Sequence, residues 1–241
     1  MDPFTAAILA GIIATVGATA ILGAVKYSPR AMRWVKRWFL GTEFVILGPS
    51  LAGKTSFLNY LKHDQFADIY PTKGTVRVTK INSFSANKGG DFNLEVSEAF
   101  DTPGTLDVDD QIGIVIKEKP ETLILWTSLT DPKAAVWLSS ICLYLNNRLL
   151  EDQALAKKLK SLTVVMNKQD EVADDIIKEQ KDKFHSIISK VLRPAFGDNV
   201  DKVSILPCTL VKANGGEKAA NNVLLTIASS LIKAKPLARR K

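Results

Sequence analysis

The amino-acid sequence predicts an α/β fold, a doubly wound and mainly parallel sheet flanked by helices, behind one N-terminal transmembrane helix. Three observations carry this prediction. Short apolar runs alternate with segments of helical periodicity from residue 42 onward, the order typical of parallel sheets. A glycine-containing turn joins the first apolar run to the first helical segment. An uncharged run, 6–25, precedes all of this.

Length and charge divide the chain of 241 residues into four parts. Segment 1–25 holds the uncharged run, 26–41 is a basic and aromatic linker, 42–233 is one globular domain, and 234–241 is a basic tail. The net charge is +7, and basic clusters lie in the linker and the tail. Such clusters suit an anionic membrane surface, so we expect no direct nucleic-acid binding. The two cysteines lack metal or disulfide spacing, which favours a reducing compartment.

The uncharged run 6–25 is long enough to cross a hydrocarbon core of about 30 Å at about 1.5 Å per residue. Basic residues follow this run and do not precede it, so the positive-inside rule places the globular domain in the cytosol. We therefore expect a single-pass membrane protein, in the endoplasmic reticulum if the source is eukaryotic. An interfacial helix and a cleaved leader are the alternatives. Trp34 and Trp38 suit the headgroup layer or pack on the domain.

Small residues recur at every fourth position of the run, and Gly11 and Gly23 are among them. Such a ridge lets two helices approach closely in lipid. A transmembrane-helix dimer or a transmembrane partner is therefore one interpretation, and a generic alanine-rich span is the other.

A phosphate-binding motif, GxxxxGK[ST], follows the predicted strand Thr42–Leu47 and precedes a predicted helix, 56–61. This context identifies a P-loop NTPase. Glycines let the loop wrap phosphate, and backbone N–H groups at the helix N-terminus attract anions. Lys54 is expected to bind the β and γ oxygens, and the Thr55 hydroxyl to bind Mg²⁺. The predicted phosphate-binding residues are Gly48, Pro49, Ser50, Leu51, Ala52, Gly53, Lys54, Thr55 and Ser56.

A second motif, Asn167-Lys168-Gln169-Asp170, follows the predicted strand 163–166. The Asp170 carboxylate can accept hydrogen bonds from guanine N1 and N2, a donor pair that adenine lacks. We expect Asn167 to tie this loop to the phosphate loop, and the Lys168 stem to cover the base. The predicted ligands are therefore GTP or GDP with Mg²⁺, and an ATP-dependent enzyme is disfavoured.

With these motifs, the segment 42–232 resembles the Ras-like small GTPases. In spacing it is most similar to the Arf family and to the beta subunit of the signal recognition particle receptor. The segment 70–74 reads Tyr-Pro-Thr-Lys-Gly and resembles the Arf-type switch I, and 101–104 reads Asp-Thr-Pro-Gly and resembles the family's DxxG. The resemblance implies that Thr72 closes onto Mg²⁺ and the γ-phosphate, that Asp101 holds Mg²⁺ through water, and that Gly104 contacts the γ-phosphate. It assigns Lys54, Thr72 and Gly104 to catalysis.

The chain departs from the family pattern in two places, the last base-contacting segment and the residue after the DxxG motif. Cys208, Thr209 and Leu210, the predicted last base-contacting residues, stand where Ser-Ala-Lys is usual; Thr209 can replace the serine, but Leu210 differs. Thr105 follows the DxxG motif, where relatives carry the Gln that orients the attacking water. We therefore expect hydrolysis of GTP to GDP and phosphate to be slow, or to need a residue from a partner.

The remaining elements follow from periodicity. Strands are predicted at 76–83 and 93–100, joined by an extended turn, 85–91, that is either a partner surface or a plain turn. Asp107, Asp109 and Asp110 read as a solvated acidic loop. The later elements are a strand at 122–126, a helix at 134–150, an apolar segment at 155–159, a helix at 174–192 halted by Pro194, a strand at 203–206 and a helix at 223–232.

The function implied is that of a membrane-anchored GTP-binding protein, a nucleotide-dependent switch or docking subunit that recruits a cytosolic partner to the membrane. The partner would engage the switch regions, and the resemblance suggests a receptor alpha-type subunit. The alternative is a structural receptor subunit that holds GTP constitutively and hydrolyses little of it.

Overall fold

The computed structural model describes residues 42–63, 76–85, 93–101, 103–210 and 215–232. The predicted transmembrane run, the linker, switch I with Thr72, nearly all of the turn 85–91 and the basic tail lie outside these residues. Within the described part of the chain, no helix combines the length and the apolar character needed to cross a membrane.

Six strands form one sheet in the order β2-β3-β1-β4-β5-β6. They are β1 (Thr42–Leu47), β2 (Val76–Ser85), β3 (Asn93–Asp101), β4 (Thr122–Ser128), β5 (Ser161–Asn167) and β6 (Ser204–Pro207). Neighbouring strands run parallel except β2 and β3, which are antiparallel. The predicted mainly parallel sheet is confirmed. Every residue of β4 and β5 is buried, which explains their continuous apolar runs.

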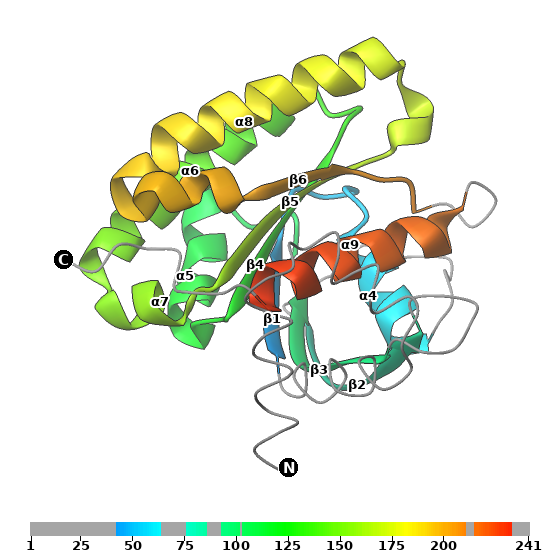
Figure 1. The fold of residues 1–241 in the computed structure, drawn as a ribbon, viewed down its shortest axis with the longest axis horizontal. Coiled ribbons are helices and arrows are strands. Elements are labelled where there is room, and N and C mark those ends of the chain that lie inside the picture. The colour runs from blue at the N-terminus through cyan, green and yellow to red at the C-terminus, as the bar shows by residue number, and fades with distance from the viewer. Residues whose placement is uncertain (1–41, 64–75, 86–92, 102, 211–214, 233–241) are drawn as a thin grey trace, which may run out of the picture.

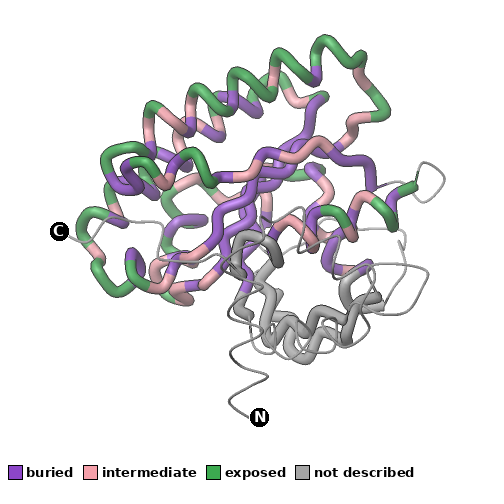
Figure 2. The backbone as a smooth tube through the Cα atoms, viewed as in Figure 1, coloured by how far each residue is buried: buried purple, intermediate pink, exposed green. Residues whose placement is uncertain are grey.

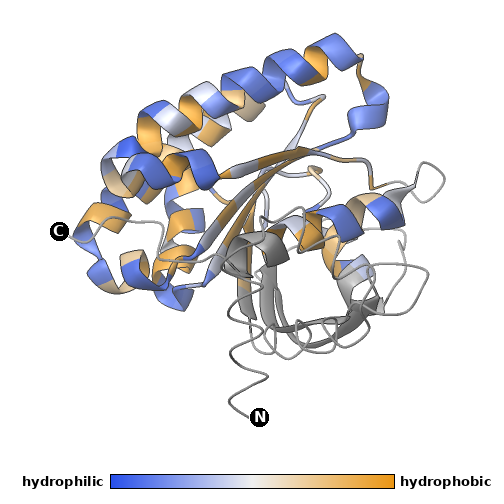
Figure 3. Cartoon of the chain, in the orientation of Figure 1, coloured by the Kyte–Doolittle hydropathy of each residue, from blue (hydrophilic) through white to orange (hydrophobic). Residues whose placement is uncertain are grey.

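Helices cover both sides of the sheet. They are α4 (Lys54–His63), α5 (Val108–Glu118), α6 (Ala134–Glu151), α7 (Gln153–Lys158), α8 (Asp174–Phe196) and α9 (Gly216–Ile232), with short 3₁₀ turns η1 (Gln169–Glu171) and η2 (Gly197–Lys202). Figure 1 shows α4 and α9 on one face of the sheet and α5, α6 and α8 on the other. The doubly wound arrangement is therefore confirmed. Burial follows the sheet in Figure 2, and hydrophilic and hydrophobic segments alternate along α8 in Figure 3.

The acidic segment after the DxxG motif is a helix start, so the expectation of a loop was wrong. Asp107 is the N-cap of α5, and its side chain accepts a hydrogen bond from the Asp110 N–H at 2.9 Å. Asp109 and Asp110 lie exposed in the first turn. Negative side chains stabilise this end of a helix, because its first N–H groups lack partners within the helix.

Pro194 does not halt α8, which continues to Phe196. A proline inside a helix removes one N–H donor and disturbs the carbonyl four residues before it. The next N–H, that of Ala195, instead donates to the Asn146 side chain of α6 at 3.2 Å. Ala195 and Phe196 are buried, so apolar packing holds the last turn in place. Helix α9 also differs, because it begins at Gly216, well before the predicted Val223.

The carboxyl ends of the parallel strands meet at one edge of the sheet. Ser128 of β4 pairs with Asn167 of β5, and Met166 of β5 pairs with Pro207 of β6. Ile46, one residue before the end of β1, pairs with Asp101 at the end of β3. The loops that leave these strands therefore converge, and this edge is where open α/β sheets bind ligands.

Candidate nucleotide site

The predicted phosphate loop joins β1 to α4, as its motif requires. Leu51 and Gly53 have positive φ angles of 61° and 102°. A Cβ atom placed on Gly53 would lie 2.3 Å from Nδ2 of Asn167. Only glycine suits this position, because it needs both a left-handed backbone and room for the neighbouring amide. The Gly53 carbonyl accepts from the Phe57 N–H at 3.1 Å and begins the helix.

Lys54 holds its ammonium group inside this loop. The residue is 5% exposed, and Nζ donates to the carbonyls of Gly48 at 2.7 Å and Pro49 at 2.8 Å. Thr55 and Ser56 follow it in the first turn of α4 and are half-buried. A buried cation beside backbone N–H groups and a helix N-terminus provides a positive cradle of the kind that binds phosphate.

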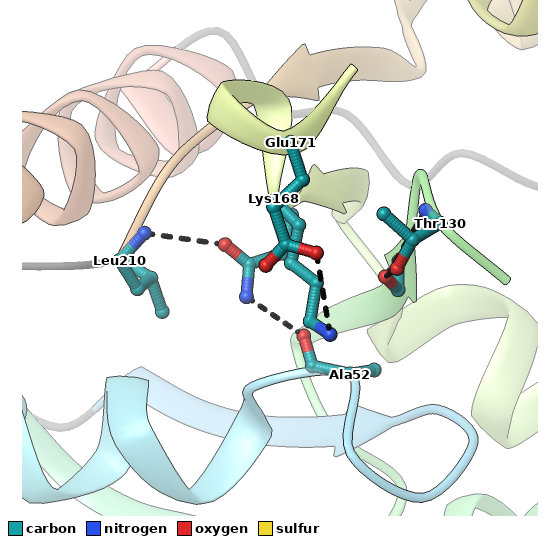
Figure 4. Close-up of polar contacts among 7 residues, drawn as sticks. Ala52, Thr130, Lys168, Glu171 and Leu210 are labelled. Carbon is teal, nitrogen blue, oxygen red and sulfur yellow. Dashed lines mark hydrogen bonds and ion pairs between the residues drawn. The ribbon is translucent and has the colours of Figure 1, made fainter. Parts of the chain in front are cut away.

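Asn167 connects three segments that are far apart in sequence. Its Nδ2 donates to the Ala52 carbonyl of the phosphate loop at 2.9 Å. Its Oδ1 accepts from the Leu210 N–H at 3.2 Å and from the Cys208 thiol at 3.5 Å. Figure 4 shows Ala52 and Leu210 on opposite sides of this amide. The predicted tie between the two loops is present in the structure.

The loop after Asn167 turns sharply. Lys168 has a left-handed backbone, with φ 65° and ψ 39°, and leads into η1. Its Nζ lies 3.9 Å from Oε2 of Glu171. The Gln169 N–H donates to the Cys208 carbonyl at 3.0 Å, and the Cys208 N–H donates to the Met166 carbonyl at 2.9 Å. These bonds hold the predicted base loop against the predicted last loop.

A cavity of about 420 Å³ opens beside Asp170. Three of the predicted base-contacting residues, Asp170, Cys208 and Thr209, line it, whereas Lys168 and Leu210 do not. Gln169 and two residues of α9, Lys218 and Asn222, also line this cavity. It therefore presents a carboxylate acceptor together with ammonium and amide donors, the mixture that a polar heterocycle needs.

The Cys208 thiol stays protonated in this setting. Burial, and next the nearby charge of Asp170, raise the pKa of Cys208 far above its ordinary value of 9.0. A protonated thiol can donate, which agrees with its contact to Oδ1 of Asn167. Cys208 thus acts as a neutral member of the loop and not as a reactive thiolate.

The DxxG glycine lies directly against the phosphate loop. A Cβ atom on Gly104 would be 2.1 Å from the Ser50 nitrogen. The backbone of Asp101 ends β3 nearby, paired with Ile46, while its side chain and all of Thr72 lie outside the described residues. The structure therefore brings Gly104 to the site and leaves the two predicted switch ligands of Mg²⁺, Thr72 and Asp101, as predictions.

Thr105 stands where the resemblance predicts a glutamine. In the part of the chain that is described, we find no other glutamine in that role. Thr105 is exposed after the DxxG motif. Gln111, the nearest glutamine in sequence, is fully buried, and its Nε2 donates to the Leu106 carbonyl at 3.0 Å. That bond holds the side chain against the start of α5.

Sequence reasoning missed three residues at this site. Trp126 is fully buried at the end of β4; its ring centroid lies 4.7 Å from that of Phe57, and its Nε1 lies 3.4 Å from a Cβ atom placed on Gly53. Trp126 packs against the phosphate loop. Its position on β4, the strand next to β1, is the feature of the sequence that could have indicated this contact. Lys218 and Asn222 were missed because the last helix was expected to begin after them.

The fold is similar to that of a translation elongation factor. One solved structure with this fold is translation elongation factor SelB from Methanococcus maripaludis, in complex with the GTP analogue GppNHp. The two share 17% sequence identity with a TM-score of 0.53, over 81% of this chain and 35% of SelB, so the chain spans about a third of that protein. No family model and no curated protein sequence matches the chain. At this identity the likeness shows a shared fold and no more.

Proposed function

We propose that this chain is a membrane-anchored GTP-binding protein that recruits a cytosolic partner to the membrane in a nucleotide-dependent way. The observation that carries the nucleotide part is the bridge made by Asn167. It joins the phosphate loop at Ala52 to the loop at Leu210, and Asp170 follows it at the edge of a cavity. This arrangement couples a phosphate cradle to a base pocket.

The described residues suit a guanine nucleotide. The ammonium of Lys54 already lies inside the loop, where phosphate oxygens would replace two carbonyls as its acceptors. Asp170 would accept from guanine N1 and N2. The Leu210 N–H is already bonded to Asn167, so a donor to guanine O6 would come from another residue that lines the cavity, and Lys218 and Asn222 of α9 are two candidates. Thr55, Thr72 and Asp101 would hold Mg²⁺, which neutralises charge on the phosphates.

Membrane recruitment rests on the sequence outside the described residues. The run 6–25 would tether the domain, and the basic linker would keep the domain on the cytosolic side. Thr72 and Gly104 would report the γ-phosphate to the surface that a partner contacts. The similarity to the beta subunit of the signal recognition particle receptor makes a receptor alpha-type subunit the proposed partner, and the endoplasmic reticulum the proposed membrane in a eukaryote.

A second candidate is a docking subunit that holds GTP constitutively. The buried position of Gln111 favours it, because this glutamine cannot take over the role that Thr105 lacks. The identity of the nucleotide released from freshly purified full-length protein distinguishes the two candidate functions. Bound GTP supports the docking subunit, bound GDP that exchanges supports the switch, and adenine nucleotide contradicts both.

The base pocket is tested by Asp170→Asn. An amide at this position presents a donor to xanthine O2, so we expect GTP affinity to fall roughly 10- to 100-fold, about 1.4–2.8 kcal/mol, while xanthosine triphosphate binding improves. Glu171→Gln is the matched control, because Glu171 is exposed and does not line the cavity. Titration calorimetry of the full chain in detergent measures the affinity of each variant for GTP and for xanthosine triphosphate. Unchanged selectivity in Asp170→Asn would mean that the base lies elsewhere.

A further inference from the structure

One wall of the cavity beside Asp170 is a single side of the start of helix α9. The residues of this wall recur at intervals of three and four, which places them on one side of a helix. We call them the α9 wall: Gly215, Lys218, Ala219, Asn222 and Val223. Gly215 has a φ of 80°, and its carbonyl accepts from the Ala219 N–H at 3.1 Å, so the helix begins here with this side toward the cavity.

The α9 wall and the phosphate cradle belong to the same face of the sheet. Helix α4, which begins at Lys54, lies on that face with α9, and the two helices contact each other. The buried Tyr60 of α4 donates its hydroxyl to Oδ1 of Asn221 in α9 at 3.3 Å. The helix that carries the α9 wall is therefore packed against the helix that carries the predicted phosphate ligands.

Two side chains give the α9 wall its polar chemistry, and they differ in what they can bind. The Lys218 ammonium only donates hydrogen bonds, whereas the Asn222 amide can donate or accept. Both residues are exposed in the open cavity. Lys218 also lies in the first turn of α9, where the helix dipole disfavours a cation. A lysine at a position that is unfavourable for its own helix points to a role in the cavity.

We propose that Lys218 determines base specificity by donating to O6 of the bound guanine, while Asp170 accepts from N1 and N2. This inference rests on the proposed function and adds a specificity-determining residue to it. Adenine carries an amino group where guanine carries O6, so a side chain that only donates rejects adenine at this position. Asn222 could turn its amide to accept from that amino group, so it would not discriminate.

The test removes the ammonium and varies the base. Lys218→Met keeps a long side chain with good helix propensity at an exposed position, so we expect the variant to fold. The probes are GTP, inosine triphosphate, which keeps O6 but lacks the N2 amine, and 2-aminopurine riboside triphosphate, which keeps that amine but lacks O6. Calorimetry of the nucleotide-free full chain in detergent measures the first two, and the fluorescence of 2-aminopurine measures the third.

We expect Lys218→Met to weaken the binding of GTP and of inosine triphosphate roughly tenfold, and to change binding of the 2-aminopurine nucleotide less than about twofold. Lys218→Arg keeps a donor and should retain most of the GTP affinity. Lys183→Met, exposed on α8, is the matched control, because it removes the same charge away from the cavity.

Two results would overturn the proposal. An equal loss with all three nucleotides would show that Lys218 acts on the phosphates or through net charge. Unchanged GTP affinity in Lys218→Met would assign O6 to another donor. The wild-type chain distinguishes these results from failure of the proposed function: a wild type without guanine nucleotide uptake overturns both, whereas a wild type that binds GTP as tightly as Lys218→Met does overturns the role of Lys218 alone.

Discussion

At the scale of single residues, the nucleotide site depends on the close approach of Asn167 to Gly53. The amide reaches the Ala52 carbonyl at 2.9 Å only because Gly53 has no side chain in its way. The same amide holds Leu210 through its oxygen at 3.2 Å. One small residue therefore lets the phosphate loop and the base loops act as one unit.

Substitution of this glycine tests that dependence. Gly53→Ala places Cβ 2.3 Å from Nδ2 of Asn167 at a φ of 102°, so we expect a loss of about 1–3 kcal/mol in the free energy of unfolding and loss of nucleotide binding. Gly113→Ala is the matched control. Gly113 lies exposed in α5 with nothing within 4 Å of its Cβ position, and there we expect a gain of about 0.5–1 kcal/mol. Denaturant unfolding measures the free energy of unfolding of both variants. Equal changes in Gly53→Ala and Gly113→Ala would refute the steric argument.

At the scale of elements, Asp152 links α5 to α7. Its side chain accepts from the N–H groups of Ala154 at 2.9 Å and Leu155 at 3.0 Å, so it caps α7. It also pairs with Lys119, the C-cap residue of α5, at 2.8 Å. The hydrogen bond from Lys119, and next that from the Leu155 N–H, lower the pKa of the Asp152 carboxyl below its ordinary value of 3.8.

This lowered pKa predicts a pH-dependent stability. The unfolded state binds the proton more tightly than the folded state, so the carboxylate stabilises the fold above about pH 4 and loses this effect as the pH falls toward the folded pKa. We expect Asp152→Asn to reduce the free energy of unfolding at pH 7 and to have a smaller effect near pH 3. Glu151→Gln, the exposed neighbour, serves as control. A deficit of the same size at both pH values would show that the charge has no part in the cap.

The sequence predicted the strands well, because β4, β5 and the last four residues of β1 are buried and form apolar runs. It missed α5, because its acidic first turn looks like a loop until Asp107 is seen to cap it. It also missed the start of α9, whose first turns hold few apolar residues, and with it Lys218. The phosphate and base motifs could be located, since their residues are contiguous. The support from Trp126 could not be located in the same way, since Trp126 contacts the phosphate loop and Phe57 of α4, which are far from it in sequence.

At the scale of the whole molecule, the fold gathers the predicted site at one edge of the sheet. The strand ends bring the phosphate loop, Asn167 and Asp170 to this edge, where the carboxyl ends of the parallel strands meet. Ligand that binds only the folded state stabilises it by about 2.7 kcal/mol at a concentration of 100 Kd. Nucleotide should therefore protect the whole domain, and the predicted tether would hold it at the membrane.

The most direct measurement is a calorimetric titration of the full chain in detergent, freed of any co-purified nucleotide, with GTP, GDP and ATP in the presence of Mg²⁺. We expect saturable uptake of one guanine nucleotide per chain, and binding of ATP weaker by roughly a hundredfold or more. Heat signals that show no guanine nucleotide uptake, or equal affinity for ATP, would contradict it.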